Sequence, residues 1–262
     1  MVSSALLSRG GETATLSTMA RLDPSVYLGH LRADGGALVD AARLGLGAQV
    51  PSCPNWRVGD LVAHVGRMHQ WVTEIVSTRA AARVDAAALP PPPGPRELLV
   101  WFATGVERLA FTLAEAGPDA RVWNWAGAEP TAAFWFRRMA HETAMHRWDA
   151  QSAHGLATPI DPLLASDGID ELLEVFLPLA APGADLGGSL HLHASDTAGE
   201  WLVCPGEQGP RVQRSHAAAD AVARGPACTL LLCLWRRVAP AALDTDGDAA
   251  ILARWQDLIR ID

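Results

Sequence analysis

The chain has 262 residues, of which 49% are hydrophobic, so it can bury a sizeable core in one large or two small domains. Its formal net charge is −8, which argues against a nucleic-acid or anionic-membrane binder. Its 21 basic residues are all arginines, so a catalytic lysine is excluded. No segment reaches about 18 uninterrupted apolar residues, so we expect no membrane span. Four scattered cysteines without a CxxC pair favour a cytoplasmic location over a disulfide scaffold.

A helical region is expected to follow a flexible tail. The first 22 residues lack the basic start and apolar run of a signal peptide, and we expect residues 1–22 to form the tail. Amphipathic patterns, separated by proline and glycine breaks, predict helices over residues 24–50, 57–84, 96–116, 131–154 and 162–179. The Gly35–Gly36 pair weakens the first of these, and Asn55 is the expected N-cap of the second. The sequence thus predicts a helical bundle over residues 23–182.

The pattern changes after residue 183. SLHLHAS and EWLVCP alternate as strands do, with a turn between them, and RVQRSH is a candidate third strand. AAADAVARG is interpreted as a short helix, CTLLLCLWRRV as a buried helix, DTDGD as a turn and Asp248–Ile259 as a last amphipathic helix. The expected fold class is therefore α plus α+β, with a small α+β domain over residues 183–262.

Polar side chains repeat along one side of the predicted helix that contains HETAMHRWDA. Glu142 and His146 are four residues apart, so they differ by roughly 40° of rotation, and Asp149 extends the same stripe. His64 lies on another amphipathic segment, DLVAH. One histidine from one helix and a Glu/His pair from another is a pattern by which helix bundles build metal centres.

Several other interpretations of these residues are open. A zincin motif is excluded, because His141 and His146 are five residues apart and point about 140° away from each other. Glu142 could instead pair with Arg138 on a solvated face, and His64 could be an ordinary hydrogen-bonded histidine. Periodicity alone does not decide between these interpretations.

Longer segments resemble a known family. WRVGDLVAHVG, RRMAHETAMHRWDA and, near the end, SLHLHASDTAGEW, ARGPACTLLLCLWRR and DGDAAILARW are similar to segments of the mycothiol-dependent maleylpyruvate isomerase family. The lead-in VPSCPNW, before the second helix, resembles the family as well. The resemblance covers about residues 24–262. It implies a DinB-like four-helix bundle followed by a small sterol-carrier-like α+β domain.

The resemblance also implies a site. A divalent metal, usually zinc, would be held by His64, Glu142 and His146. Asp149 falls where the family has a polar residue important to activity, and it could instead orient His146. Arg237 falls where the second domain contributes an arginine that binds the cosubstrate and takes part in catalysis, although its neighbour Arg236 is an alternative. Mycothiol is the implied cosubstrate.

The implied reaction is thiol transfer to an electrophilic small molecule, or its thiol-assisted cis–trans isomerisation. Two other functions stay open: an apolar small-molecule or lipid carrier, since ten tryptophans could line a cavity, and a hydrolase that uses zinc-bound hydroxide. The expected partners are a small electrophilic substrate and a low-molecular-weight thiol, with no nucleic acid and no membrane. We expect a monomer or a weak homodimer.

A second pair of histidines lies outside this site. His191 and His193 are two residues apart on a predicted strand and therefore point to one face. They could contribute to a second metal site, but surface or interface histidines are the favoured interpretation at this stage.

Overall fold

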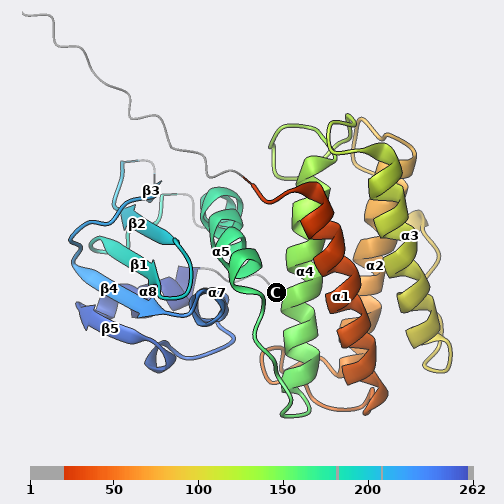
Figure 1. Cartoon of the computed structure of the whole chain (residues 1–262), viewed down its shortest axis with the longest axis horizontal. Helices are drawn as coiled ribbons and strands as arrows, with labels where there is room; N and C mark the ends of the chain where they lie inside the picture. The colour runs from red at the N-terminus through yellow and green to blue at the C-terminus, as the bar shows by residue number, and fades with distance from the viewer. Residues whose placement is uncertain (1–20, 181–182, 208, 259–262) are drawn as a thin grey trace, which may run out of the picture.

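The structure is a computed structural model that describes residues 21–180, 183–207 and 209–258. Most of the predicted tail over residues 1–22 and the end of the last predicted helix lie outside the described residues. Figure 1 shows a helical bundle on one side and a small sheet on the other, with α5 and α7 between them. The expected fold class, α plus α+β, is confirmed.

Four long helices form the bundle. They are α1 (Pro24–Arg43), α2 (Val58–Ser77), α3 (Leu98–Ala116) and α4 (Ala133–Ser152), with a short 3₁₀ turn, η1 (Ala86–Ala88), between α2 and α3. Helix α1 packs on α3 and α4, and α2 packs on the same two helices. All four helices were expected, but α1 and α2 end seven residues earlier than predicted. No described helix is long and apolar enough to cross a membrane.

The connection between α1 and α2 corrects one prediction. Asn55 does not cap α2; the cap residue is Arg57, whose backbone N–H donates to Asp60 Oδ2 at 2.9 Å. Gln49 Nε2 donates to the carbonyls of Pro54 and Trp56, at 2.7 Å each. These contacts hold the intervening residues in a tight loop, so the helix begins after it.

Helix α5 connects the bundle to the sheet. It spans Pro162–Glu171 and continues through a π turn, η2 (Leu172–Phe176), into α6 (Leu177–Ala180). It packs on α7 (Ala227–Leu234), where a Cβ on Gly168 would lie 3.1 Å from the Leu231 side chain. The predicted domain boundary at residues 182 and 183 stays a prediction.

The sheet has the strand order β3-β2-β1-β4-β5, and only β1 and β4 pair in parallel. Its strands are β1 (Leu190–Ala194), β2 (Glu200–Cys204), β3 (Arg211–Gln213), β4 (Ala221–Gly225) and β5 (Asp244–Gly247). Two predictions were wrong here: AAADAVARG contains β4 instead of a short helix, and DTDGD forms β5 instead of a turn. A 3₁₀ turn, η3 (Pro240–Ala242), precedes β5, and α8 (Ala249–Leu258) follows it and contacts β4.

Candidate metal centre

Three predicted side chains meet between α2 and α4. His64 Nε2 lies 3.2 Å from Glu142 Oε1, and His146 Nε2 lies 3.4 Å from the same oxygen. One donor atom from each residue can be chosen so that all three lie within 4.8 Å of one another. Adjacent ligands around a tetrahedral zinc ion are about 3.4 Å apart, so this donor set is spaced for such an ion.

Glu142 uses its two oxygens differently. Its Oε2 accepts from Arg138 Nη2 at 3.1 Å, so the pairing weighed as an alternative is present as well. The pair is not on a solvated face, because the side chains of Arg138 and Glu142 are only 8% and 18% exposed. Burial alone would raise the pKa of Glu142, but His146, His64 and Arg138 lower it well below its usual value. Glu142 is therefore a carboxylate whose Oε1 faces both imidazoles.

Asp149 lies behind His146 and is fully buried. Its Oδ2 is 3.0 Å from His146 Nδ1, and its Oδ1 accepts from Ser52 Oγ at 2.5 Å. Burial alone would raise the pKa of Asp149, but hydrogen bonds from His146 and Arg237 hold it at about 2. The ionised carboxylate keeps a proton on Nδ1 of His146 and directs Nε2 toward Glu142.

Arg237 reaches this centre from the second domain. Its Nη2 and Nε donate to Oδ2 and Oδ1 of Asp149 at 3.1 and 3.3 Å. Arg236 is exposed and has a φ of 62°, in the left-handed region, where the chain turns after α7. Of the two arginines, Arg237 is the one beside the predicted ligands.

The loop before α2 contributes residues that sequence reasoning missed. The Trp56 ring lies 4.7 Å from the His64 ring, centroid to centroid, and Ser52 bonds Asp149. Burial and the nearby Asp149 raise the pKa of Cys53, which keeps this side chain a thiol. The signal in the sequence was the resemblance of VPSCPNW, and of WRVGDLVAHVG that starts at Trp56, to the family, and it assigned no role to Ser52, Cys53 or Trp56.

His141 faces away from the centre, as its spacing predicts. Its Nδ1 lies 2.9 Å from Glu171 Oε2 and its Nε2 lies 3.0 Å from Asp167 Oδ2, both on α5. Burial alone would lower the pKa of His141, but Glu171 and Asp167 raise it. His141 therefore belongs to the contact between α4 and α5.

An aromatic pocket lies along α2 beyond the centre. Met68, one helical turn after His64, is part of its wall. The pocket has a volume of about 680 Å³ and is lined by Met68, Trp71, Arg83, Trp123, Asn124, Trp125 and Gly127. Four of these residues come from the loop between α3 and α4, so that loop shapes the space one turn along α2 from His64.

Comparisons with known proteins agree with this architecture. One family model, the mycothiol maleylpyruvate isomerase N-terminal domain, matches residues 28–151, and a second, the MDMPI C-terminal domain, matches residues 164–254. Two crystal structures of mycothiol-dependent maleylpyruvate isomerase are similar, one of them of a histidine-to-alanine variant. The variant has a TM-score of 0.63 and the other structure 0.57; each is 14% identical and the alignment covers 87% of this chain and 95% of the other. No curated protein matches the chain in sequence.

Proposed function

The chain belongs to the mycothiol-dependent maleylpyruvate isomerase family, and from this premise we propose that it is a zinc-dependent enzyme that activates mycothiol for attack on an electrophilic small molecule. The observation that carries the proposal is the convergence of His64, Glu142 and His146, with an aromatic pocket one turn along α2 from His64. The cytoplasmic location and the monomer or weak homodimer stay predictions.

The proposed ligands suit the metal by residue type. Two imidazoles and one carboxylate are good zinc ligands, and three protein ligands leave one position open. Zinc held by these three residues would supply a Lewis acid that lowers the pKa of a thiol, so that a thiolate would be available at neutral pH. Arg138 fixes the carboxylate of Glu142, and Asp149 fixes the ring of His146.

In this proposal, Arg237 binds an anionic group of the substrate. Three of its five N–H groups are bonded within the described residues, to Asp149 and to the Trp235 carbonyl. The remaining two can bind a carboxylate of the substrate or the charge that develops on it. Asp149 in turn holds the guanidinium in one orientation.

The pocket residues imply a substrate with an apolar or unsaturated body. Trp71, Trp123 and Trp125 offer ring faces and edges, and Arg83 offers a cation at the rim. In the isomerase version, the thiolate sulfur bonds to one carbon of a cis double bond, the π bond breaks, and its electron pair moves onto the conjugated carbonyl group, which leaves a single carbon–carbon bond. The carbon–carbon bond then rotates and the sulfur leaves. In the transferase version, the sulfur stays bonded to carbon.

The first test is a thiol-dependent assay on metal-free and zinc-loaded protein. Because the similar crystal structures are of maleylpyruvate isomerase, maleylpyruvate is the first substrate, followed by other electrophiles with adducts detected by mass spectrometry. We expect turnover only with both zinc and mycothiol. Turnover without thiol would favour the hydrolase, whereas a metal-free protein whose tryptophan fluorescence is quenched by lipid would favour the carrier.

A matched pair of variants tests the ligand set. His64→Ala should lose the zinc ion of this centre and thiol-dependent turnover together, because it removes one of three ligands. His141→Gln should keep both, because His141 faces α5. Metal content by elemental analysis is the measurement, and equal zinc in the two variants would refute the assignment.

A further inference from the structure

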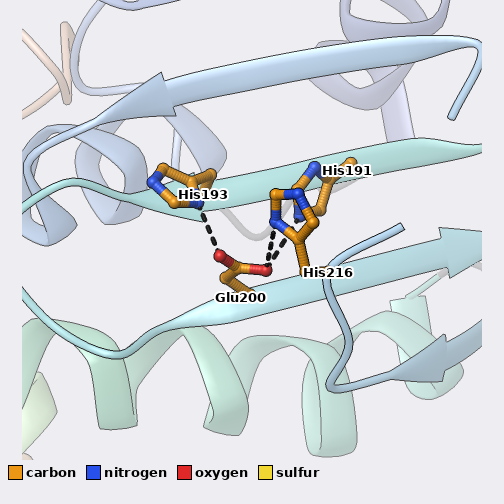
Figure 2. Close-up of side chains that lie close together, drawn as sticks. All are labelled: His191, His193, Glu200 and His216. Carbon is orange, nitrogen blue, oxygen red and sulfur yellow. Dashed lines mark hydrogen bonds and ion pairs between the residues drawn. The ribbon is translucent and has the colours of Figure 1, made fainter. Parts of the chain in front are cut away.

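A second cluster of potential metal ligands lies on the sheet. His191 and His193 are on β1, Glu200 is on β2 directly opposite His193, and His216 lies between β3 and β4 (Figure 2). The alternating residues of these strands, such as Leu192 and its partner Trp201, are buried on the other face, where Trp201 bonds Asp170 of α5. The four residues therefore occupy the face turned away from α5.

The carboxylate of Glu200 lies at the centre of three imidazoles. Its Oε1 is 2.8 Å from His193 Nδ1, and its Oε2 is 2.8 Å from His216 Nδ1 and 3.5 Å from His191 Nε2. One donor atom from each of the four side chains can be chosen so that all lie within 4.8 Å of one another. Ligand atoms around a tetrahedral zinc ion lie about 3.4 Å apart, and the side chain of His216, at 77% exposed, has room to adjust toward such an ion.

His191 supplies an independent observation. Its side chain is only 4% exposed, and its Nε2 lies 3.5 Å from Glu200 Oε2 without meeting hydrogen-bond geometry. A buried ring nitrogen that makes no hydrogen bond is uncommon in folded proteins, and a metal ion beside Glu200 would give it a partner. Figure 2 shows this ring turned toward Glu200 and His216.

The charge of the cluster suits a cation. Because an imidazole that ligates a metal does so in its neutral form, three imidazoles and one carboxylate form a ligand set with a charge of −1. The basic group on the same face of the neighbouring strand, Arg224, is directed to Asp244, with 3.6 Å between Nη1 and Oδ2. Histidine-rich sites with one carboxylate select zinc-like transition metals over magnesium or calcium.

We propose that His191, His193, Glu200 and His216 form a second zinc site, separate from the candidate centre between α2 and α4. Four protein ligands leave no open position, which is the pattern of structural zinc sites. The site ties the β3–β4 connection to β1 and β2, so its metal stabilises the second domain and takes no part in catalysis. The proposal does not depend on the proposed function.

The test measures zinc stoichiometry and melting temperature in a His64→Ala background, where the first centre is disabled. This parent should bind one zinc ion per chain and melt at a higher temperature with zinc than without it. Adding His193→Ala and His216→Ala, whose side chains are half-exposed and exposed, should abolish zinc binding and the zinc-dependent rise in melting temperature.

The matched control is His30→Ala, which removes a histidine outside both clusters. It should change neither the zinc content nor the melting temperature. Circular dichroism checks that each variant is folded, and Glu200→Gln replaces the double change if it is not.

Each result supports or overturns the proposal. If the His64→Ala parent binds no zinc, or if the cluster variants bind as much as the parent, the second site does not exist. A different result is expected if His64, Glu142 and His146 hold no metal. In that case His193→Ala/His216→Ala with an intact His64 would bind no zinc, while His64→Ala alone would still bind one ion.

Discussion

At the residue scale, Asp149 links the candidate metal ligands to the second domain. It accepts from His146 on its own helix, from Ser52 in the loop before α2, and from Arg237 after α7. A fully buried carboxylate is tolerated only when its charge is paired in this way. One side chain therefore fixes both the tautomer of His146 and the position of Arg237.

The adjacent arginines provide a matched test of the site. Arg237→Gln removes the cation beside Asp149, and we expect thiol-dependent kcat/KM to fall by about 10²- to 10³-fold, in the range typical of a lost charge-stabilising donor. Arg236→Gln should stay within about twofold of the parent, because Arg236 is exposed and has turned away. Steady-state kinetics would contradict the assignment if Arg236→Gln caused the larger loss.

His69 gives a prediction for pH. It is fully buried between Thr143 and Phe102, and burial lowers its pKa to about 4 from the usual 6.5. In the unfolded chain His69 is protonated near pH 6.5, whereas in the folded chain it is protonated only near pH 4. The free energy of unfolding therefore falls by about 3 kcal/mol as the pH is lowered from 6.5 to 4. In urea unfolding at several pH values, His69→Gln should lose less stability over this window. An unchanged pH dependence would contradict the prediction.

The sequence could predict which site residues face one another, but not all of their neighbours. A four-residue spacing places Glu142 and His146 on one face of a helix, and the structure has His64 beside them. Ser52 and Trp56 could not be predicted, because they come from an irregular loop whose path depends on tertiary contacts such as those of Gln49. The roles of all five residues in catalysis or metal binding stay predictions.

At the scale of elements, α1 shows how two neighbouring glycines differ. Gly35 faces α3, where an added Cβ would lie 2.9 Å from both methyl carbons of Val106. Gly36 faces solvent, with no atom within 4 Å of such a Cβ. The pair that weakened the helical pattern in the sequence therefore contains one glycine needed for close packing and one that only lowers helix propensity.

Alanine substitutions separate these two effects. Gly35→Ala should destabilise the protein by about 1–3 kcal/mol, because α1 and α3 must move apart or Val106 must change rotamer. Gly36→Ala should stabilise it by about 0.5–1 kcal/mol, because alanine favours the helix and meets no neighbour. Chemical denaturation of both variants measures the difference, and equal effects would show that the α1–α3 contact is not as close as described.

Elements were predictable where local pattern and tertiary context agree. The long helices carry repeated apolar positions, and their existence followed from the sequence. Strands β4 and β5 did not, because AVARG has the alanines of a helix and DTDG the residues of a turn. Pairing with β1 makes AVARG a strand, and DTDG then forms the edge strand beside it. Such long-range pairing overrides weak local propensity.

At the scale of the whole molecule, α5 is bonded to both domains. Toward the bundle, Asp167 pairs with Arg137 and His141 of α4. Toward the sheet, Asp170 accepts from Trp201 Nε1 at 2.7 Å and from Arg214. Together with the Arg237–Asp149 pair, these buried contacts connect the two domains.

These connections predict cooperative unfolding. We expect one calorimetric transition for both domains, because separating them would take Arg237 away from Asp149 and would break the buried pairs of either Asp167 or Asp170. Arg214→Gln, which removes one partner of Asp170, should lower the stability by about 2–4 kcal/mol and broaden the transition toward two steps. Two well-separated transitions in the unmodified protein would contradict this description.

The central claim, that His64, Glu142 and His146 hold a metal which activates a thiol, is tested most directly by adding zinc back to metal-free protein. The His216→Ala variant is suited to this titration, because its proposed second site is weakened. Mycothiol-dependent turnover should be absent without metal, should rise to a plateau at about one zinc ion per chain, and should stay absent in His64→Ala/His216→Ala. Full turnover by the metal-free protein, or undiminished turnover after loss of His64, would contradict the claim.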